Sequence, residues 1–407
     1  MKTAYNVFLT ALCIIVLSWF LPWLYFIIFP QGGSDPFVAY SPVTDTFIIS
    51  EAGGGDIYAV GHDGRRLAPD ITKEERDSLL PQIYFTQLVS QERLPDSVAG
   101  HSVSIPELKH AQWVFTSIPH DINKVPAQVY MIMESMPARV DLEDPKEVFR
   151  LNGKVEFIDI QSNTVNPTRS ARFTDLFAQR GFEYPVKALN ANITTRKPYD
   201  EGYLMADSKG DIFHVKMQAG RPYMVRVSKP DSVVAEHLFI LENTDTRQLG
   251  LITDTAHNLY VLEHEGYRLI PLPVGKVNPA TDRIAIVKNL FNWVIRISTP
   301  EATRWEAIDS DTYRHLASYS EPYATSKAET IAGYIFPFEI SFSSVMDSLA
   351  FPRIEFFGWN FIFLNILLAA LMPVLLRRRQ RCQILTATAT TLLFGIFAFI
   401  PFICLKQ

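Results

Sequence analysis

The chain has 407 residues, 43 of them acidic and 38 basic, and 48% of its residues are hydrophobic. Its cysteines, Cys13, Cys382 and Cys404, leave the long central part of the chain without a thiol, which excludes a disulfide framework or a thiolate metal site there. All 43 acidic residues lie between Asp35 and Glu355 together with only 32 basic residues, and the resulting net charge of −11 argues against binding to nucleic acid.

Three uncharged apolar stretches, at residues 7–29, 356–376 and 384–405, are each long enough to cross a bilayer. A hydrocarbon core of about 30 Å needs about 20 helical residues. The sequence therefore predicts an N-terminal transmembrane anchor (1–30) and a C-terminal transmembrane helical hairpin (356–405). A cleaved signal peptide is the alternative for the first stretch, but Pro30 is not followed by a small-residue cleavage site.

The orientation of these segments follows from a cluster of arginines in the turn between the second and third stretches. Short loops rich in Lys and Arg stay in the cytoplasm, so we expect this turn and Lys2 inside and residues 31–353 outside. The topology-determining residues are Arg377, Arg378, Arg379 and Arg381. In a bacterial cell this predicts a multi-pass protein of the inner membrane with a cytoplasmic N-terminus and a large periplasmic domain.

Asn365 is the notable polar residue of the second apolar stretch. An antiparallel third helix would place small residues up to Gly395 near the same depth, where they allow close helix packing. We therefore expect Asn365 and Gly395 to pack the hairpin. A channel formed by these helices alone is not expected, because none of them carries a charged residue.

The external domain (31–330) contains a recurring pair of strand-like runs, each pair joined by a short turn. The runs at 47–51 and 56–60, at 203–207 and 211–215, and at 251–254 and 258–262 follow this pattern, and Asp207 and Asp254 are 47 residues apart. A repeat of about 40 to 50 residues made of short strands is typical of β-propeller blades. The predicted fold class is a mainly β, β-propeller-like extracytoplasmic domain with three transmembrane α-helices; a sandwich or barrel is the alternative.

The sequence also predicts two short helices and a connector. Thr72 and Glu75 have capping-box spacing and predict a short helix that ends before Pro81. The apolar residues of 170–180 share one helical face, and Gly181 ends that helix. The aromatic-rich residues 331–355 predict an interfacial connector, with a core strand over 334–342 as the alternative.

The search for chemistry gives few candidates. The nine histidines show no metal-binding spacing, and no serine-hydrolase or phosphate-loop motif is present. His62, His214 and His264 each follow a repeated strand run closely, so His214 and His264 are the candidate ligand-binding residues. Asp309 and Asp311 resemble only part of a calcium loop, and simple solvation explains them better. We expect no catalytic residue, no metal and no cofactor.

A resemblance enters at residues 194–203, Thr-Thr-Arg-Lys-Pro-Tyr-Asp-Glu-Gly-Tyr, and at 211–216, Asp-Ile-Phe-His-Val-Lys. Here the chain resembles the membrane-anchored envelope proteins of Gram-negative anaerobes grouped as domain of unknown function family 4857. The likeness extends to residues 79–81 and 94–96 and to the three-helix layout. It implies an inner-membrane protein with a periplasmic domain, encoded beside ABC-transporter subunits, and it supplies no catalytic residues.

The expected function is therefore that of a non-catalytic accessory or scaffold protein that holds a β-rich module at the outer face of the inner membrane. Its expected partners are the lipid bilayer and membrane proteins of a transport (ABC-type) or envelope complex. The rival hypothesis is a periplasmic ligand sensor or enzyme that uses a propeller funnel containing His214 and His264.

Overall fold

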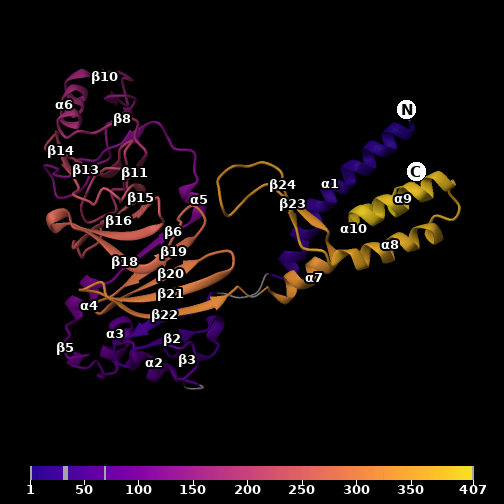
Figure 1. The fold of residues 1–407 in the computed structure, drawn as a ribbon, viewed down its shortest axis with the longest axis horizontal. Coiled ribbons are helices and arrows are strands. Elements are labelled where there is room, and N and C mark those ends of the chain that lie inside the picture. The colour runs from indigo at the N-terminus through magenta and orange to yellow at the C-terminus, as the bar shows by residue number, and fades with distance from the viewer. Residues whose placement is uncertain (1, 31–34, 68–69, 324, 406–407) are drawn as a thin grey trace. The chain divides into compact units, whose positions relative to one another are not determined.

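A computed structural model describes residues 2–30, 35–67, 70–323 and 325–405 (Figure 1). The chain forms two compact units, a β domain (Pro36–Pro322) and a helical unit made of residues 1–35 and 323–407. The predicted start of the external domain, at residue 31, lies outside the described residues. The β domain ends at Pro322, before the predicted boundary at residue 330, and helix α7 (Lys327–Ile335) belongs to the helical unit.

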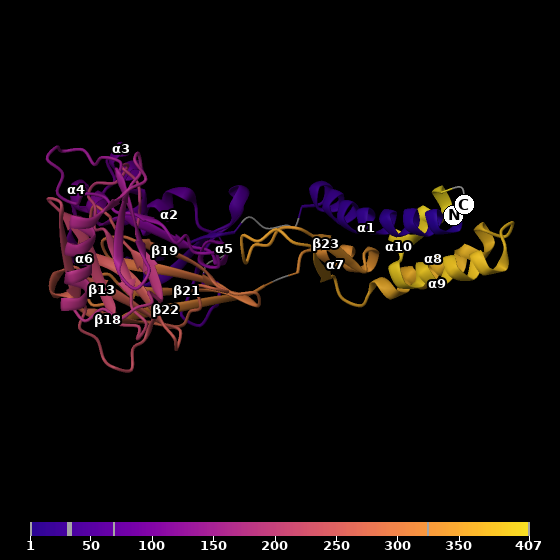
Figure 2. The ribbon, with the colours of Figure 1, turned by 90° about the horizontal axis from the view of Figure 1, so that it is seen from above.

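Five antiparallel sheets lie side by side in the β domain (Figure 1), and the view from above superimposes them (Figure 2). We number the sheets in spatial order: sheet I contains β1 (Phe37–Ser41), β2 (Thr46–Ser50) and β3 (Ile57–Val60), and sheet II contains β6 (Trp113–Ser117), β19 (Arg283–Lys288), β20 (Asn292–Ser298), β21 (Ala302–Asp309) and β22 (His315–Pro322). Sheet III contains β15 (Ala235–Ile240), β16 (Gln248–Asp254), β17 (Asn258–Glu263) and β18 (Leu269–Lys276). Sheet IV contains β11 (Ala188–Asn190), β12 (Tyr203–Ala206), β13 (Ile212–Gln218) and β14 (Arg221–Arg226), and sheet V contains β7 (Tyr130–Met131), β8 (Glu147–Leu151), β9 (Val155–Asp159) and β10 (Val165–Asn166).

Each pair of successive sheets encloses a separate hydrophobic layer. Successive residues of a strand point to opposite faces of its sheet. In β16, Leu251 therefore packs toward sheet II and Ile252 toward sheet IV. Every residue of β16 is buried, which explains why the central strands read as continuous apolar runs instead of alternating ones. Trp293, between sheets II and III, is the largest of the fully buried side chains.

The two ends of the series differ. Helices α2 (Lys73–Leu79) and α3 (Pro81–Ser90) cover the outer face of sheet I, where Leu80 packs against Ile48. The last sheet of the series, sheet V, carries the cross-strand ion pair Arg150–Glu156, 2.6 Å long. No hydrophobic cluster among the described residues joins sheet I to sheet V. The mainly β prediction is confirmed, but the sheets form an open series and not the closed ring of a propeller.

The repeated strand runs correspond to the central hairpins β2–β3, β12–β13 and β16–β17. The equivalent aspartates close equivalent turns: Oδ1 of Asp207 accepts the backbone N–H of Lys209, and Oδ1 of Asp254 accepts that of Ala256. An Asp side chain at this position stabilises a turn by mimicking a backbone hydrogen bond. The 47-residue period therefore records a repeated hairpin, as predicted, within an open stack.

Short elements complete the β domain. The predicted capping box of Thr72 and Glu75 is present at α2, and the predicted second helix is α6 (Pro167–Gln179), followed by Gly181 with φ of 74°. The remaining elements are β4 (Ser97–Val98), β5 (His101–Ser102), α4 (Ile105–Ala111), α5 (Pro119–Ile122) and the 3₁₀ turns η1 (Ala52–Gly54) and η2 (Glu265–Tyr267).

The helical unit contains α1 (Lys2–Ile28), α7, α8 (Phe361–Leu375), α9 (Arg381–Phe394), α10 (Ile396–Cys404) and the hairpin of β23 (Phe338–Ser341) and β24 (Arg353–Phe356). Among the described residues only α1, over Tyr5–Ile28, is both long and apolar enough to cross a membrane. The second predicted span is shorter than expected, because Phe356 ends β24 and the helix begins at Phe361. The third is divided into two helices at Gly395. The predicted connector contains the end of α7 and the β23–β24 hairpin.

Candidate functional site

His214, one of the two predicted ligand-binding residues, lies on the face of β13 that packs against sheet III. It is fully buried. Its neighbours Phe213 and Val215 point the other way, into the layer shared with sheet V. Its Nε2 lies 2.7 Å from the carbonyl oxygen of Glu201, and its Nδ1 lies 2.8 Å from the hydroxyl of Tyr267. Both ring nitrogens are therefore hydrogen-bonded inside the protein.

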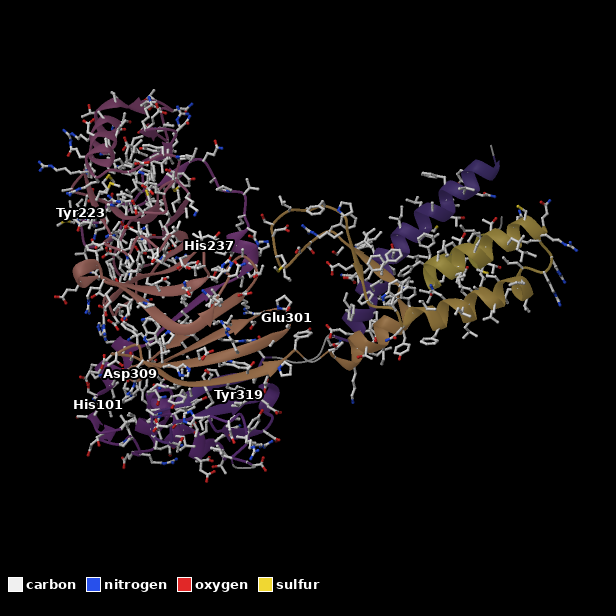
Figure 3. All side chains as sticks on the ribbon, in the orientation of Figure 1. His101, Tyr223, His237, Glu301, Asp309 and Tyr319 are labelled. Atoms are coloured by element: carbon white, nitrogen blue, oxygen red, sulfur yellow. The ribbon has the colours of Figure 1, made fainter. Side chains whose placement is uncertain are left out.

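These contacts fix the tautomer of the ring. A carbonyl oxygen only accepts, so Nε2 of His214 carries the proton and Nδ1 accepts from the Tyr267 hydroxyl. The hydroxyls of Tyr223 and Tyr267 are 3.0 Å apart, and since the Tyr267 proton is used on His214, Tyr223 donates. The result is a directed chain of hydrogen bonds from Tyr223, which lies at the edge of the β domain, to the interior (Figure 3).

Glu201 is the centre on which the charged groups converge. Its carboxylate lies 2.7 Å from Nζ of Lys216 and 3.4 Å from Nε2 of His264. The next residue, Gly202, has φ of 66°, and a Cβ atom there would collide with the carbonyl oxygen of Val215. Only glycine allows the chain to approach β13 this closely, which brings the Glu201 carbonyl to His214.

Burial controls the charge state of the histidine. Desolvation lowers the pKa of His214 to about 4, although the Glu201 carbonyl and carboxylate oppose this shift. Burial also raises the pKa of Tyr267, and its hydrogen bond with Tyr223 adds to this effect. At neutral pH the relay therefore contains the neutral imidazole of His214 and the neutral phenol of Tyr267, beside the ion pair of Glu201 and Lys216.

A second buried network lies directly before Glu201 in sequence. Nζ of Lys197 is 2.6 Å from Asp200 Oδ1 and 2.7 Å from Glu242 Oε1, and all three side chains are removed from solvent. The backbone N–H of Glu201 donates to the same Glu242 oxygen, at 2.6 Å. Ser135 donates to the other oxygen of Asp200, at 2.5 Å. The segment 197–202 thus ties sheet III to sheet IV and to the chain that enters sheet V.

The structure brings together the two predicted ligand-binding residues, His214 and His264, and places His62 of the repeat elsewhere. His264, half-exposed after β17, stacks on the ring of Tyr267 with 6.5 Å between ring centroids and shares Glu201 with His214. Their positions are not equivalent within the repeat, because His214 is inside a strand and His264 follows one. His62 is exposed in the turn after β3 of sheet I, and it takes no part.

Sequence reasoning missed Lys216, Tyr223 and Tyr267. It interpreted Asp200 and Glu201 as a solvated pair of acids, but both are buried. The alternation of β13 could have placed Lys216 on the face of His214, because Lys216 is two positions after His214 in the strand. The contribution of Tyr267 could not be found this way, since it comes from the turn before β18 in a different sheet.

The acidic candidates and other carboxylates have structural roles. Asp309 Oδ1 accepts the N–H groups of Asp311 and Thr312, so it closes a turn as Asp207 and Asp254 do. A cavity of about 380 Å³ beside sheet V is lined by several acids, but Glu134 there accepts the backbone N–H groups of Ala219 and Gly220. Within the part of the chain that the structure describes, no group of three or more His, Cys, Asp or Glu could hold a metal.

The predicted packing residues of the helical unit are in contact. Nδ2 of Asn365 donates to the carbonyl of Leu392 at 3.0 Å, and Gly395 approaches Asn365 so closely that a Cβ atom would overlap its Oδ1. The amide thus satisfies a carbonyl that the interruption between α9 and α10 leaves free. Of the topology-determining arginines, Arg379 donates to the carbonyl of Leu405 at 3.2 Å, and the others are exposed. The exposed arginines are Arg377, Arg378 and Arg381.

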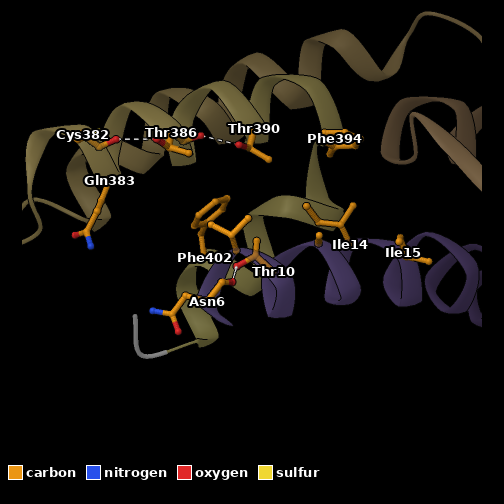
Figure 4. A pocket seen from close by; sticks show the side chains of 12 residues that line it. Asn6, Thr10, Ile14, Ile15, Cys382, Gln383, Thr386, Thr390, Phe394 and Phe402 are labelled. Atoms are coloured by element: carbon orange, nitrogen blue, oxygen red, sulfur yellow. Dashed lines mark hydrogen bonds between the residues drawn. The ribbon is translucent and has the colours of Figure 1, made fainter. Parts of the chain in front are cut away.

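A groove of about 540 Å³ separates α1 from α9 (Figure 4). Its polar lining residues use their hydroxyls locally: Thr386 donates to the carbonyl of Cys382, and Thr390 to that of Thr386. The groove therefore presents a largely apolar surface with no charged side chain among the residues that line it.

Comparisons with known proteins give one family match. The family described as Domain of unknown function (DUF4857) matches residues 37–308. No curated protein matches the chain.

Three solved structures are similar at a low level. The β-propeller domain of Myceliophteria thermophila Cps50 (Swd1) is 14% identical over 50% of this chain and 58% of that chain, with a TM-score of 0.27. The dihydro-heme d1 dehydrogenase NirN in complex with DHE is 11% identical over 76% of this chain and 50% of that chain, with a TM-score of 0.28. PorZ of the type-IX secretion system of Porphyromonas gingivalis is 10% identical over 71% of this chain and 34% of that chain, with a TM-score of 0.22. The chain thus spans 58% and 50% of the lengths of the first two.

Proposed function

Since the chain belongs to the DUF4857 family, a domain of unknown function, we propose from its own residues that it is a membrane-anchored, non-catalytic accessory or scaffold protein. In this proposal the helical unit lies in the bacterial inner membrane, with the N-terminus and the arginine turn in the cytoplasm. The β domain lies in the periplasm, where it serves a transport (ABC-type) or envelope complex.

The observation that carries this proposal is the surface of α1. This helix has 27 residues, carries no charge after Lys2, and leaves large apolar side chains such as Val7, Phe8 and Trp23 about half-exposed or more. Burying such side chains is worth about 1.5–3 kcal/mol each, so they require lipid or partner helices around them. The groove between α1 and α9 would accept a partner helix with small or apolar residues.

Among the described residues, the two buried polar networks are both closed to a substrate, which supports a non-catalytic role. The imidazole of His214 is fully buried and both its nitrogens are occupied, so a substrate could not reach it without breaking the relay. The Lys197 network is equally enclosed. These groups hold sheets together, which is what a rigid docking module needs.

Topology can be tested with one native cysteine and one introduced cysteine. Val140 is fully exposed on the β domain, and Cys382 is exposed directly after the arginine turn. With a membrane-impermeant maleimide, Val140→Cys should be labelled in intact spheroplasts, whereas Cys382 should be labelled only after permeabilisation. Labelling of Cys382 in intact spheroplasts would reverse the proposed orientation.

Partner docking can be tested by gentle-detergent purification and mass spectrometry. We expect ATPase and permease subunits in a fixed ratio, and we expect Thr390→Phe, which fills the groove, to lose them. Leu385→Phe is the matched control, because Leu385 is 70% exposed on α9 and does not line the groove. Recovery of the protein alone from native membranes would contradict the accessory role.

A ligand sensor or enzyme is the second candidate, and one observation favours it. The hydrogen-bond relay connects the buried His214 to Tyr223 and Tyr267, which keep contact with solvent, and to the half-exposed His264. A ligand at this edge could be sensed through the relay. Cells carrying His214→Ala and His264→Ala with unchanged function would remove this candidate.

A further inference from the structure

The β23–β24 hairpin of the helical unit places two carboxylates directly opposite each other. Glu339 of β23 pairs with Glu355 of β24 in the register of the hairpin. Directly opposed residues share one face of an antiparallel pair, with about 4.5–5.5 Å between their Cβ atoms, and like charges at such positions destabilise the pair. Sheet geometry alone therefore does not explain this arrangement.

Within the part of the chain that the structure describes, these carboxylates have no neutralising cation. Among the described residues, no Lys or Arg forms an ion pair with Glu339 or Glu355. The nearest basic residue on the hairpin, Arg353, lies 2.7 Å from Asp347 and is used there. Desolvation raises the pKa of Glu339, and the charge of Glu355 raises it further. Glu339 is half-buried, whereas Glu355 is exposed and accepts a hydrogen bond from the hydroxyl of Ser341 at 3.4 Å. The pair is thus a negative site with no paired cation among the described residues.

Two tryptophans of α1 face the same space as Glu339. A cavity of about 410 Å³ is lined by Trp19, Trp23 and Phe26 of α1 and by Glu339 and Ser341 of β23. The indole rings of Trp19 and Trp23 are stacked, with centroids 6.4 Å apart and 23° between their planes. Both side chains remain about half-exposed, at 45% and 51%. We call this space the Trp–Glu cavity.

Aromatic faces together with carboxylates form a site for an organic cation. An ammonium group over a tryptophan face is attracted by the ring quadrupole, and the attraction increases where water is excluded. A primary ammonium also donates hydrogen bonds to carboxylate oxygens, which a quaternary ammonium cannot do. An anionic headgroup, in contrast, would be repelled by Glu339 and Glu355.

The position of the cavity along α1 identifies the source of the cation. Trp23 lies five residues before Ile28, the last residue of α1, which corresponds to about 7 Å along the helix axis. In a helix that spans a bilayer this is the depth of lipid headgroups, where tryptophan is enriched. The apolar surface of α1 continues from the cavity toward the bilayer centre, alongside which acyl chains would lie.

We propose that the Trp–Glu cavity binds the primary ammonium headgroup of an aminophospholipid, with Glu339 and Glu355 accepting its hydrogen bonds and Trp19 and Trp23 covering its charge. This inference depends on the proposed membrane anchoring. The bound headgroup supplies a positive charge to Glu339 and Glu355, and so joins α1 and the β23–β24 hairpin at the membrane surface.

The test uses the full-length protein in nanodiscs that contain phosphatidylethanolamine, phosphatidylcholine and phosphatidylglycerol in equal amounts. Native mass spectrometry should find phosphatidylethanolamine retained at least fivefold above its share of the bilayer. The double variant Glu339→Gln/Glu355→Gln should reduce this enrichment to the bulk ratio, and Trp23→Leu should weaken it. The matched control Glu301→Gln changes an exposed glutamate of the β domain, labelled in Figure 3, and should leave the enrichment unchanged.

Other outcomes would overturn the assignment. Equal retention of phosphatidylcholine would exclude a primary ammonium as the recognised group. Displacement of the lipid by millimolar phosphoethanolamine would identify a soluble amine as the ligand. No enrichment in a wild-type protein that resists carbonate extraction would refute the cavity alone, whereas extraction by carbonate would refute membrane anchoring. The double variant should keep or raise its melting temperature, because the substitution removes like-charge repulsion, so its loss of lipid would not reflect unfolding.

Discussion

Lys197 and Glu242 form an ion pair 2.7 Å long in which the lysine side chain is 2% exposed and the glutamate side chain is 0% exposed. Lys197 precedes β12 of sheet IV, and Glu242 follows β15 of sheet III, so the pair joins two sheets. Asp200 shares the same ammonium group. One buried lysine therefore holds the segment that carries Glu201 in place, and with it the relay to His214.

Lys197→Met should destabilise the β domain strongly. Removing one partner of a buried ion pair leaves uncompensated charge, which typically costs about 3–5 kcal/mol. Urea denaturation followed by circular dichroism measures this loss. Lys154→Met is the control, because Lys154 forms an exposed pair with Glu156 and such pairs contribute about 0–1 kcal/mol. Similar losses in the two variants would contradict the importance of the buried network.

The stability of the β domain should depend on pH through His214. Its folded-state pKa of about 4 lies below the ordinary value of 6.5, so between these values the unfolded chain binds the proton preferentially. The contribution of His214 to the free energy of unfolding is therefore fully present above about pH 6.5. It is lost as the pH falls toward 4, by up to about 3 kcal/mol. Comparing urea denaturation of the wild type and His214→Gln at pH 7 and pH 4.5 isolates this contribution. An equal pH dependence in both proteins would show that His214 is not responsible.

Tyr267→Phe should break the relay at its centre. The substitution leaves Nδ1 of the buried His214 without its donor, and an unsatisfied buried group costs about 1–3 kcal/mol. Tyr223→Phe should cost less, since the bond between Tyr267 and His214 remains. Nitrogen NMR of labelled histidine should show the proton of His214 on Nε2 in the wild type. A proton on Nδ1 would reverse the assigned direction of the relay.

Gly395→Ala should destabilise the helical unit, because the added Cβ atom would overlap Oδ1 of Asn365 and the residue has φ of 56°. Such overpacking typically costs about 1–3 kcal/mol. Gly358→Ala is the control: it also has a positive φ, but no atom lies within 4 Å of its added Cβ. Thermal unfolding in detergent compares the two.

A double variant separates the collision from backbone strain at Gly395. Gly395→Ala/Asn365→Ala removes the atom with which the new methyl group would overlap. Its loss relative to Asn365→Ala should therefore be smaller than the loss of Gly395→Ala relative to the wild type. Equal losses would assign the whole effect to backbone conformation.

Much of the local structure could be predicted from the sequence because it depends on neighbours in the chain. The capping box at Thr72 and Glu75 and the turn aspartates Asp207 and Asp254 act within a few residues of themselves. The apolar runs at β12 and β16 predict strands for the same reason. Their continuous hydrophobicity, however, does not say which sheet covers each face.

The candidate site was predictable only in part. His214 and His264 could be selected because each follows a repeated run, but their common contact, Glu201, comes from a third segment. Tyr267 reaches His214 only because sheets III and IV are stacked. The hydrogen-bond partners of a buried ring depend on that stacking, which the local sequence pattern does not predict.

By itself the sequence determined the apolar helices, the hairpin repeat and the acidic character of the β domain, because these follow from composition and short-range periodicity. Tertiary structure alone decided that the sheets form an open series, that α9 and α10 are separate, and that Glu339 faces Glu355. These features depend on which surfaces pack against each other over long sequence distances. Their free energy comes from burial and from the pairing of charges removed from water, and neither can be read from one segment of the chain.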